Sequence, residues 1–126
     1  MILLDSNILI RFSRGDDQVA KWLETAATEN EVAISVITVL ELLLGSRDKR
    51  HLRDIKAFLS RYETVQLDED ISRRAATLVE VYFLSHGLQI ADSLIAATAL
   101  VHGHELATLN TKDFRFIGDL KLVHCP

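Results

Sequence analysis

The sequence predicts an α/β fold built on a parallel or mostly parallel sheet of about five strands. Short apolar runs of the kind found in buried strands alternate along the chain with stretches whose apolar residues recur at helical spacing. Strands that are separated by helices pair in parallel, because a parallel connection needs a crossover long enough to hold a helix. The predicted strands are residues 2–4, 32–36, 65–67, 105–109 and 120–123.

The predicted helices are marked by apolar periodicity and by residues that begin or end helices. Residues 5–7 (Asp-Ser-Asn) can cap a helix that starts directly after the first strand. Thr38 can cap the helix that carries Glu41, and Gly45 can end it. Further helices are predicted at residues 19–26, 52–59, 71–82 and 94–101, with Gly87 and Gly103 stopping the last two.

Composition predicts one domain over residues 1–126. A chain of this length with 48% hydrophobic residues can build one core, and no Gly- or Pro-rich linker divides it. Cys125 is the only cysteine, which excludes an internal disulfide and a cage of thiolate metal ligands. No apolar stretch approaches the roughly 20 residues that span a bilayer. We therefore expect a soluble, cytoplasmic protein with no membrane partner.

The charge distribution leaves a nucleic-acid partner open. A net charge of −4 argues against general coating of a polyanion, but it does not exclude a local basic face. Five basic residues crowd into residues 47–56, where apolar positions at helical spacing could face a core. A solvated helix face explains this basic strip at least as well as contact with RNA does. The residues are Arg47, Lys49, Arg50, Arg53 and Lys56.

Four acidic residues are predicted to form one site: Asp5, Glu41, Asp92 and Asp113. Three of them closely follow predicted strands, and ligands of parallel sheets collect beyond the carboxyl ends of the strands. Glu41 lies in the apolar run of residues 39–44, where a carboxylate is costly unless a positive charge compensates it. Oxygen ligands suit hard divalent cations. The pattern therefore indicates a metal site.

Each acid taken alone also has an ordinary structural explanation. Asp5 and Asp92 both resemble helix N-caps. Glu41 follows Thr38 by three residues, which is the spacing of a capping box. Asp113 lies among residues that favour turns. The spacing of the acids leaves both explanations open.

Other catalytic chemistries find less support in the sequence. The histidines form no zinc-binding motif, and His102 and His104 flank Gly103 at a predicted helix end, which suits an imidazolium. No Gly-x-Ser-x-Gly elbow and no Gly-rich phosphate loop is present. Any chemistry is therefore expected to come from the acids and from what they bind.

Four segments together resemble the PIN-domain nucleases. They are LDSNILI at residues 4–10, SVITVLELLLG at 35–45, IADSLIAATA at 90–99 and TLNTKDF at 108–114. The segments occur in order over nearly the whole chain. More narrowly, they resemble the VapC-type toxins of bacterial toxin–antitoxin systems.

The resemblance implies a three-layer α/β/α fold and an endoribonuclease that depends on Mg²⁺ or Mn²⁺. A metal-activated water would then hydrolyse RNA phosphodiesters. It also implies a cognate antitoxin whose C-terminal segment enters the active-site groove, and self-association as a homodimer, for which Leu43, Leu44 and Phe83 are candidate contacts. The catalytic and metal-binding residues that it implies are Asp5, Glu41, Asp92 and Asp113.

The resemblance also implies supporting residues around the acids. Asn7 and Thr108 fall at positions that support the carboxylates or position water and phosphate. Ser6 stands where many members have threonine, and it keeps the hydroxyl group. Some members carry an acid at the position of Asn110, so Asn110 and Asp113 are both candidates for the last role.

Two alternative functions remain at this point. A receiver domain of a signalling system also gathers acids and Mg²⁺ at strand ends, and Asp68 would be its phosphoacceptor here. The second alternative is a catalytically inactive PIN-like module that only binds a partner.

Overall fold

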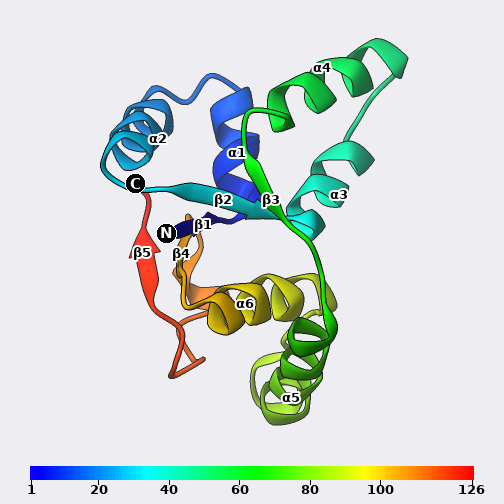
Figure 1. Ribbon diagram of the computed structural model, residues 1–126, viewed down its shortest axis with the longest axis vertical. Coiled ribbons are helices and arrows are strands. Elements are labelled where there is room, and N and C mark those ends of the chain that lie inside the picture. The colour runs from blue at the N-terminus through cyan, green and yellow to red at the C-terminus, as the bar shows by residue number, and fades with distance from the viewer.

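The computed structural model describes residues 1–126 and contains one sheet of five strands, all of them parallel. The strands are β1 (Ile2–Leu4), β2 (Val32–Ser35), β3 (Glu63–Val65), β4 (Glu105–Thr108) and β5 (Leu122–His124). Their order across the sheet is β3-β2-β1-β4-β5, which places the first strand of the chain at the centre (Figure 1). The predicted parallel α/β architecture is therefore confirmed.

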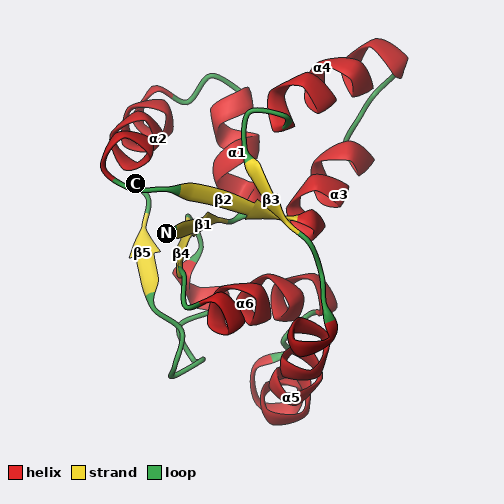
Figure 2. Cartoon of the chain, in the orientation of Figure 1, coloured by secondary structure: helices red, strands yellow, loops and turns green.

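Six α-helices and one 3-10 turn connect the strands (Figure 2). Several helices begin with an acidic cap, since Asp16, Asp48 and Asp68 each accept hydrogen bonds from backbone N–H groups of the first turn. The helices are α1 (Ser6–Ser13), α2 (Asp17–Glu29), α3 (Val36–Leu44), α4 (Lys49–Leu59), α5 (Glu69–His86) and α6 (Ile90–His102), and the 3-10 turn is η1 (Thr111–Asp113).

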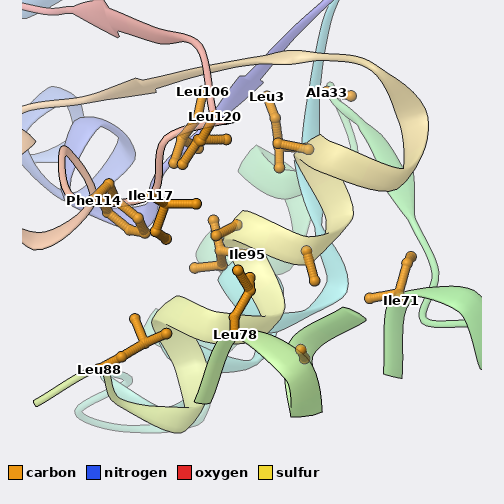
Figure 3. Close-up of a cluster of buried hydrophobic side chains, with 14 residues drawn as sticks. Leu3, Ala33, Ile71, Leu78, Leu88, Ile95, Leu106, Phe114, Ile117 and Leu120 are labelled. Atoms are coloured by element: carbon orange, nitrogen blue, oxygen red, sulfur yellow. The ribbon is translucent and has the colours of Figure 1, made fainter. Parts of the chain in front are cut away.

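The helices cover both faces of the sheet, which gives three layers (Figure 1). Successive residues of a strand point to opposite faces, so β1 contributes to two cores. Leu3 packs in a cluster with α5 and α6, where Ile95 and Leu78 are also buried (Figure 3). Ile2 and Leu4 belong to the second cluster, which is covered by α1 to α4. The three-layer arrangement that the resemblance implied is confirmed.

The order of the strands creates a switch point between β1 and β4. From β1 the chain moves through α1 and α2 to β2 on one side, whereas β4 pairs on the other side of β1 and leads on to β5. In open parallel sheets, ligands bind beyond the carboxyl ends of the strands where the chain direction reverses in this way. The topology therefore points to the ends of β1 and β4.

Four predicted strands have different boundaries in the structure, and β4 differs only in ending at Thr108 instead of residue 109. Residue 36 is the first residue of α3 and not part of β2, because the Ser35 hydroxyl accepts a hydrogen bond from Ile37 N at 3.0 Å and starts the helix. Strand β3 ends at Val65, two residues before the predicted end, because the chain then approaches the Asp68 cap of α5. Strand β5 begins at Leu122, since Leu120 is still in a turn that its N–H closes onto Ile117 O.

Two predicted helix caps are wrong. Thr38 lies inside α3, whose cap is Ser35, so the capping box with Glu41 does not form. Asp92 lies in the first turn of α6, which begins at Ile90 after Gln89, and it caps nothing. Glu41 and Asp92 thus lack the capping roles that were the alternative to metal binding.

The glycines predicted to stop helices do so. Gly87 and Gly103 adopt left-handed conformations, with φ of 66° and 67°, at the ends of α5 and α6, and Gly45 follows the last residue of α3. No helix combines the length and the hydropathy needed to cross a bilayer.

Candidate active site

The centre of the candidate site is Asp5, at the carboxyl end of the central strand. It follows β1 directly, caps α1, and is only 5% exposed. Thr108, the last residue of β4, is fully buried beside it and donates a hydrogen bond from Oγ1 to Asp5 Oδ2 at 2.8 Å. Two strands that meet at the switch point therefore bring together residues that are 103 positions apart.

Hydrogen bonds hold the Asp5 carboxylate in one orientation. Ser6 N donates to Oδ1 at 2.8 Å while the Thr108 hydroxyl occupies Oδ2. Burial raises the pKa of Asp5, the two hydroxyls and the Ser6 amide oppose that rise, and the negative charge of Asp113 adds to it. All of its protein donors are neutral, so nothing in the chain cancels its charge.

Ser6 links Asp5 to the second acid. Its Oγ lies 3.1 Å from Glu41 Oε1 and 3.4 Å from Asp5 Oδ1. A hydroxyl has one proton, so Ser6 can donate to only one of the two carboxylates at a time, and the contact with Glu41 is the shorter. Desolvation raises the pKa of Glu41 and repulsion from Asp5 adds to it, while the Ser6 hydrogen bond works against both.

Thr108 is also the partner of two other predicted site residues. Its Oγ1 accepts from Asn7 Nδ2 at 3.3 Å and from Asn110 N at 3.1 Å. Asn7 Oδ1 in turn accepts from Leu109 N at 3.3 Å. Asn7 therefore orients the Thr108 hydroxyl toward Asp5, which fits the supporting role predicted for both residues.

Asp92 has no hydrogen-bonding partner, although it sits near three other acids. It lies in the first turn of α6 and is half-buried. Desolvation raises the pKa of Asp92 to about 6, and repulsion from Asp5, Asp113 and Glu41 contributes to the rise. Asp92 therefore lies close enough to the other three predicted acids for the charge of each to act on it.

Asp113 and Asn110 form a pair at the exposed edge of this neighbourhood. Asn110 Nδ2 donates to Asp113 Oδ2 at 2.7 Å across the turn η1. The turn conformation predicted for Asp113 is correct, and its carboxylate is nevertheless close enough to raise the pKa values of Asp5 and Asp92. Asn110 therefore acts on Asp113 as an orienting partner.

The donor chemistry of the site suits a hard divalent cation. No lysine or arginine pairs with any of the four acids, because the ion pairs of the chain join Arg11 to Asp16, Arg73 to Glu69 and Arg74 to Asp119. The donors are carboxylate, hydroxyl and amide oxygens, which Mg²⁺ and Mn²⁺ prefer. No three acids stand around a common point at ligating distance, so binding would require side chains to rotate. The donor set and its uncompensated charge fit such an ion.

Two residues near the acids were missed in the sequence. His86 and Lys112 line a small cleft of about 120 Å³ together with Asp92 and Asp113. The position of Lys112 next to Asp113 was a visible signal. His86 lies far from the acids in sequence, and in the cleft its ring stacks on that of Phe116 at a centroid distance of 4.3 Å. The cleft therefore places one cation beside the exposed side of the acids.

The Asp68 of the receiver alternative has a different role. Its Oδ1 accepts a hydrogen bond from Ile71 N at 2.8 Å as the cap of α5, after an edge strand of the sheet. The charge of Asp68 contributes to none of the raised pKa values of Asp5, Glu41 and Asp92. The structure thus places Asp68 outside the group of acids.

Comparison with known proteins identifies the class. Residues 2–119 match the PIN domain family. Ribonuclease VapC10 of Mycobacterium tuberculosis (strain CDC 1551 / Oshkosh) is 38% identical over 122 residues, which cover 96% of this chain and 91% of the relative. Ribonuclease VapC19 of the same strain is 36% identical over 123 residues, which cover 96% of this chain and 98% of that relative.

Solved structures agree with this match. A toxin–antitoxin complex from Klebsiella pneumoniae has a TM-score of 0.81 at 32% identity, covering 98% of this chain and 96% of that chain. VapBC2 from Rickettsia felis, bound to a DNA fragment from its promoter, has a TM-score of 0.82 at 31% identity and covers 98% of both chains. The chain belongs to the PIN domain family. Within that family it is a VapC-type member, as the four sequence segments predicted.

Replacing Thr108 by valine should destabilise the protein by about 1–3 kcal/mol, because a buried carboxylate loses a donor and two further hydrogen bonds lose their acceptor. Urea denaturation measures the free energy of unfolding. Thr108→Ser keeps the hydroxyl and should retain most of the stability. Equal stabilities of the valine variant and the wild type would contradict the role of this hydroxyl.

The raised pKa of Asp92 predicts a pH-dependent effect on stability in EDTA. The folded protein keeps a proton on Asp92 up to about pH 6, whereas an unfolded chain releases it near the ordinary value of 3.8. The charged carboxylate therefore lowers stability progressively as pH rises through this window. Asp92→Asn should raise Tm by a few degrees at pH 7.5 and leave it unchanged below pH 4.

The matched control is Asp70→Asn, which removes an exposed aspartate from the first turn of another helix, α5. It should not raise Tm at either pH. A Tm gain for Asp92→Asn that is the same at pH 4 and pH 7.5 would show that repulsion among the acids is not its source.

Proposed function

We propose that this protein is a metal-dependent endoribonuclease that acts in the cytoplasm as the toxin of a toxin–antitoxin pair. The observation that carries the proposal is a group of four acids at a topological switch point, with neutral donors and no cationic partner. The names of the relatives, Ribonuclease VapC10 and Ribonuclease VapC19, support the assignment of RNA as the substrate.

The acids would hold the metal, with Asp5 as the fixed ligand. Its orientation is set by Ser6 N and the Thr108 hydroxyl, so little freedom is lost when an ion binds. Glu41 is tied to the same position through the Ser6 hydroxyl, while Asp92 has every lone pair free. When bound, Mg²⁺ or Mn²⁺ would activate water and neutralise charge on the phosphoryl oxygens.

The other residues of the site would bind and orient the substrate. Asn110 holds Asp113 at the exposed edge, where a single-stranded RNA can approach. Lys112 places a positive charge beside these acids and can pair with a phosphate oxygen. Asn7 keeps the hydroxyl of Thr108 directed at Asp5 while substrate binds.

The proposed partner is a cognate antitoxin protein. One of the similar solved structures is a toxin–antitoxin complex from Klebsiella pneumoniae, which supports this proposal. A partner segment that supplies a positive charge to the acids would compensate the repulsion that raises the pKa of Asp92. Such a segment would block metal binding and substrate access together.

Cleavage of a mixed pool of structured RNA tests the proposed activity. We expect cutting with Mg²⁺ or Mn²⁺, none with EDTA, and a loss of at least about a hundredfold in Asp92→Asn, since a ligand of the metal is removed. Asp70→Asn should cut like the wild type. Absence of cutting by antitoxin-free protein with every metal would favour an inactive binding module.

Self-association is proposed from exposed apolar side chains on two helices. Leu44 at the end of α3 is 86% exposed, and Phe83 and Leu84 near the end of α5 are 54% and 92% exposed. Leu43, by contrast, packs against the core and is not available. Covering exposed apolar groups of this size with a partner lowers the free energy.

We expect a homodimer in solution that Leu44→Glu or Leu84→Glu shifts toward monomer, because a carboxylate would have to be buried at the contact. Sedimentation velocity at tens of micromolar, a common working range for specific oligomers, measures this shift. Val101→Glu is the control, because it introduces the same charge at an exposed apolar position on α6. A wild type that is monomeric under these conditions would overturn the dimer.

A further inference from the structure

A pocket of about 380 Å³ opens next to Glu41, between the C-terminal ends of α1 and α3 and the side of α4. Its volume lies in the range of about 300–1,000 Å³ that is usual for sites of small ligands. Glu41 belongs to its wall, and the Ser6 hydroxyl connects Glu41 to the acidic site. The pocket therefore borders the acidic site at Glu41.

The pocket contains positive charge that no acid neutralises. Arg14 follows α1, and Arg47 precedes α4. Neither arginine takes part in an ion pair of the chain. His51 adds a donor, because its Nδ1 accepts from Arg47 N at 3.0 Å and the ring proton is thus carried by Nε2. These groups suit an anion with several acceptor oxygens.

The helix ends around the pocket do not cancel this charge. The C-terminal ends of α1 and α3 each contribute about half a negative charge, and the N-terminal end of α4 contributes about half a positive charge. The guanidinium groups of Arg14 and Arg47 are each fully charged at neutral pH. The two arginine charges therefore outweigh the partial charges of the helix ends. Glu41 adds one negative charge to the same lining.

The apolar part of the pocket's lining, called its floor below, includes an aromatic ring. Ile10, Leu42 and Phe58 form much of it. Phe58 stacks on Phe12 at a centroid distance of 5.6 Å and an interplanar angle of 7°, and Tyr62 meets its ring edge-on at 5.6 Å. The ring is therefore held in place before any ligand arrives. Positive charge beside an apolar floor matches the two parts of a nucleotide, the phosphate and the base.

We propose that this pocket is a nucleotide subsite for the RNA substrate. Arg14 and Arg47 hold a phosphate next to the one that is cleaved, and the attached base lies on the floor formed by Leu42 and Phe58. This inference rests on the proposed ribonuclease function and adds to it. Arg14 and Arg47 are positioning residues, since they place the strand so that the neighbouring phosphodiester reaches the acids.

Binding of a single-stranded RNA oligomer in EDTA tests the subsite without turnover. In Arg14→Gln/Arg47→Gln we expect affinity to fall about tenfold and the slope of log K against log salt to fall by about 0.7, because one phosphate contact on a single strand is lost. Fluorescence anisotropy across a salt series measures both. In the cleavage assay the same variant should raise KM with little change in kcat, because it loses binding and not chemistry.

The matched control is Arg50→Gln/Arg53→Gln. It removes the same charge from exposed arginines of α4 that do not line the pocket. Affinity should change less than twofold. Equal weakening in the two double variants would show general attraction and overturn the subsite. RNA binding by a wild type that does not cleave would overturn the ribonuclease function alone.

A second measurement identifies the occupant. We expect uridine 5′-monophosphate to shift the amide resonances of Gly45, Arg47 and His51 and to bind about tenfold more tightly than inorganic phosphate. Equal affinities would overturn the placement of the base on the floor. Shifts with a glutamate-rich peptide and none with the nucleotide would assign the pocket to a protein partner and overturn the proposal.

Discussion

The structure depends on the hydrogen bond that joins Thr108 to Asp5. This bond connects the ends of the two strands between which the direction of the chain reverses, and it does so inside the protein, where water does not compete. Asp5 also begins α1, so the same carboxylate fixes a strand end, a helix start and the centre of the acidic site. A small displacement of either strand would therefore move the strand end, the start of α1 and the centre of the acidic site together.

The acids illustrate a conflict between stability and function. Asp5, Glu41 and Asp92 all have raised pKa values because burial and mutual repulsion disfavour their charged forms. Hydroxyl and amide donors reduce this cost without removing the charge, which arginine partners would do. A site that is to attract a cation has to keep its negative charge uncompensated. Repulsion among the acids is therefore left in place, and the proposed metal ion would relieve it.

Much of the fold and the candidate residues of the site could be predicted, because short local sequence patterns indicate where strands and helices begin and end. The first strand is a short apolar run followed at once by capping residues, and Gly87 and Gly103 end helices where only glycine is comfortable. The boundaries of β2 and α3 were not predictable, because Ser35 and Thr38 are both good caps and tertiary packing selects the first. The sequence also left open whether Asp92 caps a helix, because the start of α6 at Ile90 after Gln89 carries no capping signal.

Contacts between distant segments were beyond the sequence. Nothing in the spacing of Ser6 and Glu41 shows that one hydroxyl lies between two carboxylates. The pocket of Arg14 and Arg47 also depends on how α1, α3 and α4 pack, and the sequence showed only that one of these arginines belongs to a basic strip. Residue types and order thus predicted the candidate residues, and packing decided which of them lie together.

The two edges of the sheet limit how other chains can attach. Strands β3 and β5 are the outer strands and contain only three residues each. An edge this short offers too few free N–H and C=O groups to template the addition of a further strand. Association by strand addition is therefore disfavoured, and so is aggregation through repeated edge-to-edge pairing of strands. Any protein that recognises this one has to do so through the side chains of its helices and loops.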